Sequence, residues 1–239
     1  MVIRAVKYGD SSMVVTAFTE LFGLQHYMVN GVRSGKRSAS ISAAYLQVGS
    51  MLDMVVYHHE RSTLQRIREC KPALQYTDLF VDVTKNSIML FMIELLQKCL
   101  KQPDADPDLF YFIEDVMQGL DQASVSAAAN LPLFFMVHLS HFFGFRLMDN
   151  FSAERQVLDL REGQFVATAP PHEFYLSSSR SMYIAQLLRA LQVQDLEQIS
   201  MNRQLRNELI DRCIDFYGLH IQPFGTMRSL PVIRTLLES

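Results

Sequence analysis

Residues 29–38 read VNGVRSGKRS, and they stand where a series of short apolar segments gives way to a basic loop. Arg33, Lys36 and Arg37 bring three cations next to two glycines within this stretch. The stretch continues an alternating strand pattern over residues 26–32, so it predicts a charged loop at the edge of a sheet. Such a loop is suited to contact a phosphate backbone.

The segments around this loop predict a small β domain. Runs rich in β-branched and aromatic residues cover residues 2–6, 13–18, 26–32 and 46–57, and turn signals at residues 9–12, 22–24 and 34–36 separate them. Five short strands within about 75 residues favour a small barrel, either an OB fold or an SH3-like barrel.

After residue 76 the apolar period becomes helical. Helices are predicted in the regions 80–99, 108–120, 126–143, 182–191, 203–217 and 230–237. Alternation at residues 157–160 and 164–167 predicts a small β-hairpin inserted among them. The expected fold class is α+β, with a β-barrel domain at residues 1–75 followed by a mainly helical domain at residues 76–239.

The charge is divided unevenly between these two parts. Residues 1–75 hold nine Lys and Arg against five Asp and Glu, whereas residues 76–239 hold thirteen against twenty. A basic first part favours a polyanionic partner, and the acidic remainder would confine such a partner to a defined face.

Cysteine usage and hydropathy indicate a cytosolic protein. The three cysteines, Cys70, Cys99 and Cys213, are far apart and form no CxxC pair, so we expect reduced structural thiols. The longest apolar patch, residues 131–145, is interrupted by His138, Ser140 and His141 and is shorter than the roughly 18 residues of a membrane span. We expect a buried helix there, and no membrane association.

The sequence offers no candidate for catalysis. Three residues lie between Gly31 and Gly35 where a P-loop has four, and Lys36 is followed by Arg37 instead of Ser or Thr. His138 and His141 have a helical i, i+3 spacing without a third ligand, so core histidines are favoured over a metal site. Residues 104–108 lack the glycine and late Glu of a calcium loop and predict the entry to a helix. We therefore expect no enzyme activity, metal or cofactor.

Four ordered segments of the first part resemble the opening of the bacterial RecO family of recombination mediators. They are residues 8–15 (YGDSSMVV), 18–23 (FTELFG), 29–33 (VNGVR) and 36–38 (KRS). Residues 94–96, 109–110, 120–121, 134–144 and 228–233 resemble the helical domain of that family, so the resemblance spans nearly the whole chain. Many members carry four zinc-binding cysteines after the helix that ends here at Gly144, and residues 148–156 hold none. The chain therefore resembles a branch of the family without zinc, in which the predicted hairpin at residues 151–169 occupies the place of the zinc site.

The resemblance implies an OB fold that binds single- and double-stranded DNA and anneals complementary strands in DNA repair and recombination. It also implies that RecR is a partner, that RecA is loaded onto strands covered by single-strand-binding protein, and that the protein is associated with the nucleoid in the cytoplasm. By position, the expected phosphate contacts are Arg4, Lys7, Arg33, Lys36 and Arg37, and the weaker candidates for base stacking are Tyr8, Tyr27 and Tyr45.

The family also docks the acidic C-terminal tail of single-strand-binding protein on its helical domain. A basic residue beside apolar side chains would suit the terminal carboxylate of that tail, which indicates Arg146 with Phe142 and Phe145. The alternative function is a protein-interaction scaffold, in which the barrel mainly binds a partner protein and the basic loop only assists.

Overall fold

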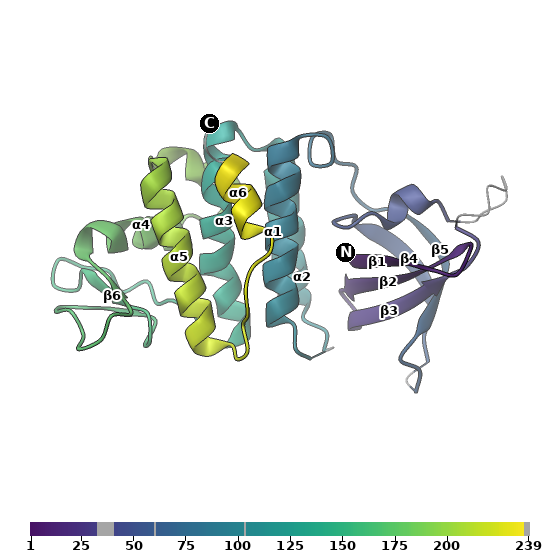
Figure 1. Ribbon diagram of the computed structural model, residues 1–239, viewed down its shortest axis with the longest axis horizontal. Coiled ribbons are helices and arrows are strands. Elements are labelled where there is room, and N and C mark those ends of the chain that lie inside the picture. The colour runs from purple at the N-terminus through teal and green to yellow at the C-terminus, as the bar shows by residue number, and fades with distance from the viewer. Residues whose placement is uncertain (33–40, 60, 103, 237–239) are drawn as a thin grey trace. The chain divides into compact units, whose positions relative to one another are not determined.

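The computed structural model describes residues 1–32, 41–59, 61–102 and 104–236 (Figure 1). The chain divides into two compact units. The N-terminal unit comprises Met1–Thr77 and Leu100–Glu114, and the helical unit comprises Asp78–Cys99 and the chain from Asp115 onward. A segment that the sequence predicted for the helical part thus packs with the sheet. The division into a DNA-binding domain at residues 1–75 and a helical domain at residues 76–239 stays a prediction.

The N-terminal unit is built on a five-stranded sheet. Its strands are β1 (Val2–Tyr8), β2 (Ser12–Thr19), β3 (Gly23–Val29), β4 (Leu52–Tyr57) and β5 (Gln65–Pro72). Their order in the sheet is β1-β2-β3-β5-β4, and all neighbours are antiparallel except the parallel pair β3 and β5. This is the strand order of an OB fold, a five-stranded and partly open barrel, so the predicted fold class is confirmed.

The barrel is open between its two edge strands. Among the described residues no ladder joins β1 to β4, although Val2 of β1 donates to the Ser50 carbonyl and accepts from the Gly49 N–H just before β4, both at 2.9 Å. The apolar side chains that face inward from β4 therefore remain only partly buried. This opening leaves part of the barrel interior accessible.

The segment before β4 differs from the expected strand. The sequence predicted a strand from Leu46, but Ala43–Leu46 forms a short 3-10 helix (η1), which begins where the Ser42 hydroxyl accepts from the Ala44 N–H. Leu46 is buried in the barrel core with Val15 and Tyr27. Gly49 has φ +90°, a conformation that glycine adopts readily, and it separates η1 from the strand.

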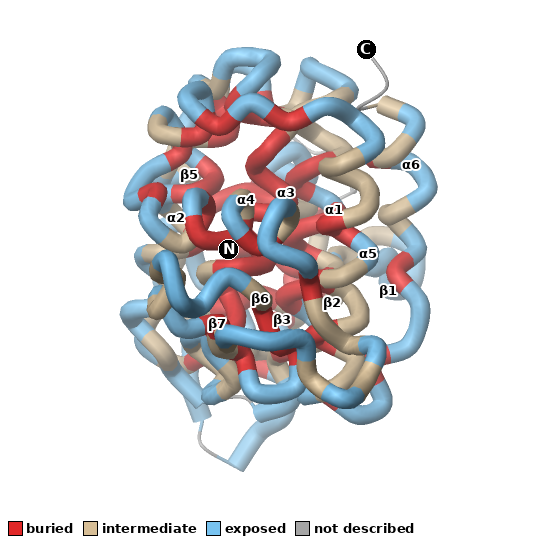
Figure 2. Tube along the Cα trace, turned by 90° about the vertical axis from the view of Figure 1, so that its left-hand side faces the viewer, coloured by how far each residue is buried: buried red, intermediate tan, exposed pale blue. Residues whose placement is uncertain are grey.

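The helical unit is assembled around α3 (Val125–Leu139), which packs against α1 (Val83–Cys99), α4 (Ser178–Arg189) and α5 (Arg203–His220). Most residues of α1 and α3 are buried, and buried segments lie behind exposed ones in Figure 2. The unit also contains α6 (Leu230–Leu236), the 3-10 helices η2 (Ser140–Phe143) and η3 (Val193–Gln198), and the later part of α2 (Pro107–Gln122).

The α3 helix extends through η2 and ends at Gly144, where φ is +79°, as the sequence predicted. The span Val125–Phe143 is long and apolar enough to cross a membrane by length and composition, although the sequence was expected to contain no such segment. Two thirds of its apolar window, 67%, is buried by the surrounding chain, which is the environment of a core helix.

The predicted hairpin is present as β6 (Val157–Asp159) and β7 (Gln164–Val166), with Leu158 opposite Phe165. A third strand that the sequence did not predict, β8 (Tyr175–Leu176), pairs with the other edge of β6. Gly163 turns the hairpin at φ +66°, and a Cβ at this position would lie 2.8 Å from the Arg146 carbonyl oxygen. Only glycine therefore fits this turn without displacing the backbone.

Distant segments of the helical unit are joined by carboxylates that accept from backbone N–H groups. The Glu94 carboxylate of α1 accepts from the N–H groups of Arg228 and Ser229 at 2.7 and 2.8 Å, just before α6. The Asp121 carboxylate of α2 accepts from the N–H groups of Asp78 and Leu79 at 2.9 and 2.7 Å. Each carboxylate thus accepts from two backbone N–H groups in the segment that precedes a helix, α6 in the first case and α1 in the second.

Candidate nucleic-acid interface

Strand alternation places one set of β1 side chains on the side of the sheet that faces away from the core. Arg4, Val6 and Tyr8 are exposed, whereas Ala5 between them packs on the barrel core. The pairing of the strands extends this set across the sheet, because residues opposite each other share a face.

Two rows of paired residues run across this face. Val6 lies opposite Val14, Val14 opposite Met28, Met28 beside Arg66, and Arg66 opposite Tyr57. In the next row Arg4 lies opposite Thr16 and Thr16 opposite His26. We call the outer sheet face the surface formed by Arg4, Val6, Tyr8, Val14, Thr16, His26, Met28, Arg66 and Tyr57.

Hydrogen bonds and charge give this face a defined chemistry. The Thr16 hydroxyl lies 3.0 Å from Nδ1 of His26, which fixes the imidazole on the sheet. Arg68 and Lys71 of β5 are paired with Glu69 and Asp53 at 3.1 and 3.5 Å. Arg4 and Arg66 form no ion pair with any residue that the structure describes. The face therefore presents two cations whose charge no described carboxylate neutralises.

Tyr57 provides an aromatic side chain beside these cations. It is 54% exposed and lies directly opposite Arg66. Tyr8, at 60% exposure, lies at the other edge of the face. A cation beside an exposed aromatic ring is the combination with which OB folds hold a phosphate and stack a base.

The structure separates the cations that the sequence grouped together. Arg4 lies on the outer sheet face, but Lys7, three positions further along β1, points to the opposite side of the strand. Lys7 is opposite Met13 near the end of the strand and is exposed there. Arg33, Lys36 and Arg37 lie outside the described residues.

The three tyrosines nominated for stacking lie in different environments. Tyr8 is on the outer sheet face, and Tyr45 is on η1. Tyr27 is 1% exposed and belongs to the barrel core, where burial raises the pKa of its phenol. Tyr27 therefore serves packing and is not accessible to a base.

Sequence reasoning found only Arg4 and Tyr8 of this face and missed the others, among them Arg66, Tyr57 and His26. The signal for Arg66 was present, because residues 65–68 read QRIR, and Gln65 and Ile67 are buried while Arg66 and Arg68 are exposed. The position of β5 was not recognised, so its alternation was not used. The parallel pairing that brings Arg66 beside Met28 joins distant parts of the chain and leaves no local pattern.

The loop between β4 and β5 is held at one end of the sheet. Gln65 accepts from the His59 N–H at 2.9 Å and donates to the carbonyls of His59 and Ser62 at 2.9 and 2.7 Å. The His58 ring stacks on Phe22 of the β2–β3 turn, with centroids 4.1 Å apart. This loop is one of those that OB folds use to contact oligonucleotides.

In the helical unit, the three residues nominated for a partner tail differ in their surroundings, and their role in binding stays a prediction. The Phe145 ring packs against Phe216, Tyr217 and His220 of α5 at centroid distances of 5.6, 5.3 and 5.2 Å. Phe142 is half-buried, at the edge of the His141 ring. The Arg146 side chain is exposed.

The histidines and aspartates that were weighed as ligands have structural contacts. Nε2 of His138 lies 3.0 Å from the Leu187 carbonyl oxygen, and its ring packs on Phe134. Burial lowers the pKa of His138. The Asp106 carboxylate accepts from the Leu109 N–H at 2.9 Å at the start of α2, so the predicted helix entry is present. Within the described residues, no three His, Cys, Asp or Glu side chains gather into a group that could hold a metal ion.

The architecture is that of a two-part α+β protein, in which an OB-fold sheet is followed by a mainly helical unit with a small inserted hairpin. The family model described as "Recombination protein O N terminal" matches residues 1–76, and the model described as "Recombination protein O C terminal" matches residues 81–229. The chain therefore belongs to the Recombination protein O family, as the resemblance indicated.

Similar proteins are matched along nearly their whole length. DNA repair protein RecO of Azobacteroides pseudotrichonymphae is 26% identical over 233 residues, which cover 98% of this chain and 95% of that protein. DNA repair protein RecO of Bacteroides fragilis strain YCH46 is 27% identical over 240 residues, covering 100% and 97%. The same-named protein of Flavobacterium johnsoniae is 27% identical over 244 residues, covering 100% and 97%. These matches place the chain among DNA repair and recombination proteins.

Proposed function

We propose that this protein binds single- and double-stranded DNA through the outer sheet face and acts as a recombination mediator. In this role it anneals complementary strands and, together with RecR, helps to load RecA onto DNA covered by single-strand-binding protein. The observation that supports the DNA-binding role is the position of Arg4, Arg66 and Tyr57 on one exposed face of an OB fold.

The affinity of such a face is chiefly electrostatic. Arginines that contact phosphates release counterions, so binding weakens as salt rises, by about one unit of logarithmic slope for each phosphate contact. Val6 and Met28 lie between the two arginines and offer apolar contact to sugars or bases. In the proposal the cations supply most of the affinity, and the tyrosine favours unpaired bases.

The basic loop contributes a second group of cations in this proposal. Arg33, Lys36 and Arg37 follow β3 in the sequence, and β3 carries His26 and Met28 of the outer sheet face. Removal of the three charges should lower the salt slope by up to about three units. We propose a binding role without catalysis, carried out in the cytoplasm in association with the nucleoid.

The decisive experiment removes the two described cations of the face. The variant Arg4→Ala/Arg66→Ala should bind a labelled single-stranded oligonucleotide roughly tenfold more weakly, because each arginine loses a charge-assisted contact. Its salt slope between about 50 and about 200 mM should fall by about two units. Fluorescence anisotropy titrations with single- and double-stranded probes measure both quantities.

A matched control removes two exposed arginines from the helical unit, in the variant Arg155→Ala/Arg228→Ala. This control changes the net charge by the same amount. If DNA contacts the outer sheet face directly, the salt dependence of DNA binding should be the same in this control as in the wild-type protein. Equal binding by the wild-type protein and the Arg4/Arg66 variant would reject the proposed face. Binding that is weak at both salt concentrations and rises only with a protein partner would favour the scaffold alternative.

A further inference from the structure

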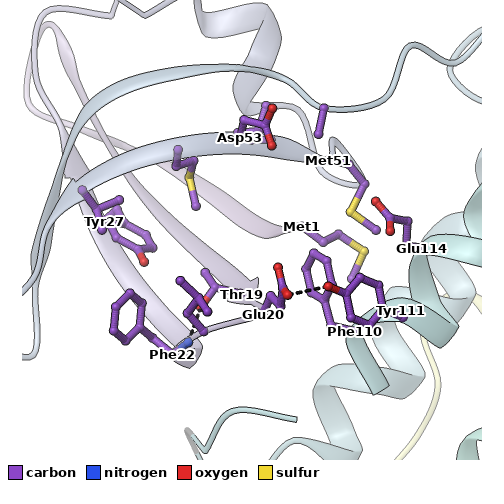
Figure 3. A pocket seen from close by; sticks show the side chains of 15 residues that line it. Met1, Thr19, Glu20, Phe22, Tyr27, Met51, Asp53, Phe110, Tyr111 and Glu114 are labelled. Carbon is purple, nitrogen blue, oxygen red and sulfur yellow. Dashed lines mark hydrogen bonds between the residues drawn. The ribbon is translucent and has the colours of Figure 1, made fainter. Parts of the chain in front are cut away.

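A second surface of the N-terminal unit has the opposite charge to the outer sheet face. It is a cavity of about 270 Å³ at the opening of the barrel (Figure 3). Its apolar lining includes Met51, Met54 and Phe22, together with Phe110 from the first turns of α2. The inward-facing residues of β4 reach this cavity because the barrel is not closed beside them.

The rim of the cavity is acidic. Glu20 comes from the β2–β3 turn, Asp53 from β4 and Glu114 from α2, and no Lys, Arg or His is among the lining residues. Asp53 pairs with Lys71 at 3.5 Å, but both side chains are largely exposed, so a cation of a partner can compete for this carboxylate. Figure 3 shows the Glu20 carboxylate directed at Tyr111, whose hydroxyl donates to it at 2.5 Å. This bond holds one rim charge in place, so part of the acidic rim is already ordered before a partner arrives.

Apolar side chains also stand on the rim. Leu21 is 73% exposed beside Glu20, and half of the Tyr111 side chain is accessible. Methionine side chains in the interior can change rotamer to fit different apolar groups, which is a property of surfaces that bind varied peptides. The volume lies below the 300–1,000 Å³ typical of small-molecule sites, so it suits one or two large side chains better than a cofactor.

We propose that this cavity is a docking site for a peptide segment of a partner protein in which a large apolar residue is flanked by Lys or Arg. The apolar side chain enters the methionine-lined interior, and the flanking cations lie against Glu20, Asp53 and Glu114. DNA is disfavoured at this surface, because the carboxylates repel phosphates. The charge complementarity with a basic peptide gives the partner its specificity and its rate of association.

The test uses the full chain and the peptide KKFLRK labelled with fluorescein. Anisotropy should show saturable binding of this peptide. Two matched peptides should bind at least tenfold more weakly, KKAARK because it lacks the apolar anchor and EEFLEE because its charge is reversed. KKAARK binding as tightly as KKFLRK would overturn the proposal, since charge alone would then account for binding.

Variants of the protein locate the peptide. Glu20→Gln/Asp53→Asn/Glu114→Gln should raise the Kd for KKFLRK about tenfold, since three exposed charge pairs contribute modestly. Ala73→Phe, at an exposed lining position, should block the cavity without removing a charge. The control Asp10→Asn/Glu69→Gln/Asp104→Asn removes three exposed acidic groups elsewhere in the same unit and should retain wild-type binding.

Circular dichroism verifies that each variant is folded, and DNA titration separates this site from the proposed function. The rim variant should keep the wild-type DNA affinity or exceed it. Unchanged peptide binding by both the rim variant and Ala73→Phe would overturn the site. A doubled mass in light scattering that the rim variant abolishes would also overturn the proposal, because the surface would then join two copies of this chain.

Discussion

On the outer sheet face Arg4 and Arg66 extend from the sheet into solvent, whereas the polar side chains at the centre of the helical unit are buried and bonded to backbone groups. Asn130 donates to the carbonyls of Leu196 and Ile199 at 3.2 and 2.7 Å, and the Tyr217 hydroxyl donates to the Met136 carbonyl at 2.7 Å. The exposed groups retain their capacity to bind a ligand, while the buried ones hold segments of the fold together. Substitutions in the two regions should therefore have separable effects.

The largest effect should come from Asn130→Ala. The side chain is 2% exposed and also accepts from the Arg206 guanidinium at 3.1 Å. Its loss removes three hydrogen bonds at once, two to carbonyls and one from Arg206, whose guanidinium keeps its bond to the Met201 carbonyl, so we expect a loss of about 3 kcal/mol in the free energy of unfolding. Urea denaturation measures this loss.

The Asn130→Ala variant also tests the comparison itself. Under conditions in which it remains folded, its DNA affinity should stay within about twofold of wild type, because the substitution lies in the other unit. Conversely, Arg4→Ala/Arg66→Ala should change the free energy of unfolding by less than about 0.5 kcal/mol, as exposed surface substitutions do. An equal loss of unfolding free energy in both variants would contradict the distinction between exposed residues that bind a ligand and buried residues that stabilise the fold.

The comparison also explains which features the sequence could predict. Alternation and turn glycines predicted β1, β2 and β3, and helical periodicity predicted α1 to α6 within a few residues, because these patterns are local. Gly144 and Gly163 marked a helix end and a hairpin turn for the same reason. Bonds such as that between Glu94 and Ser229, 135 residues apart, leave no periodic signal. The sequence therefore could not predict which distant segments of the helical unit contact each other.

The candidate site was less predictable than the fold. Arg4 and Lys7 were nominated together by their position in the sequence, although side chains three positions apart in a strand face opposite sides. Arg66 and Tyr57 become neighbours of Met28 only through the order β3-β5-β4. A face assembled by long-range pairing requires knowledge of the register.

A smaller effect is expected from Tyr57→Ala. Loss of one stacking ring should reduce the affinity for a single-stranded oligonucleotide by about 1 kcal/mol, at the low end for base–aromatic stacking, because Tyr57 stands near the edge of the sheet. Affinity for a fully paired duplex, in which bases are not available for stacking, should change less. Anisotropy with both probes measures the difference, and Tyr57→Phe should retain most of the single-strand affinity. Equal losses for both probes would assign Tyr57 to backbone contact.

The smallest effect concerns the pH dependence of the helical unit. Burial lowers the pKa of His138 below its ordinary value of 6.5, and the hydrogen bond with the Leu187 carbonyl only partly opposes this shift. Because the unfolded chain takes up a proton at His138 more readily than the folded chain, the free energy of unfolding should fall as the pH falls below 6.5. This contribution is fully present above 6.5 and is lost as the pH approaches the lowered pKa.

Urea denaturation at about pH 7 and about pH 5 measures this contribution as a difference between two proteins. His138→Gln keeps a donor for the Leu187 carbonyl but does not titrate, so it should lose less stability than wild type over this interval. The Arg4→Ala/Arg66→Ala variant should show the wild-type loss, because the two arginines that it removes do not titrate between these pH values. An equal loss of unfolding free energy in His138→Gln and wild type would mean that protonation of His138 does not contribute to the pH dependence. Burial of this polar group would then have no effect on its proton binding.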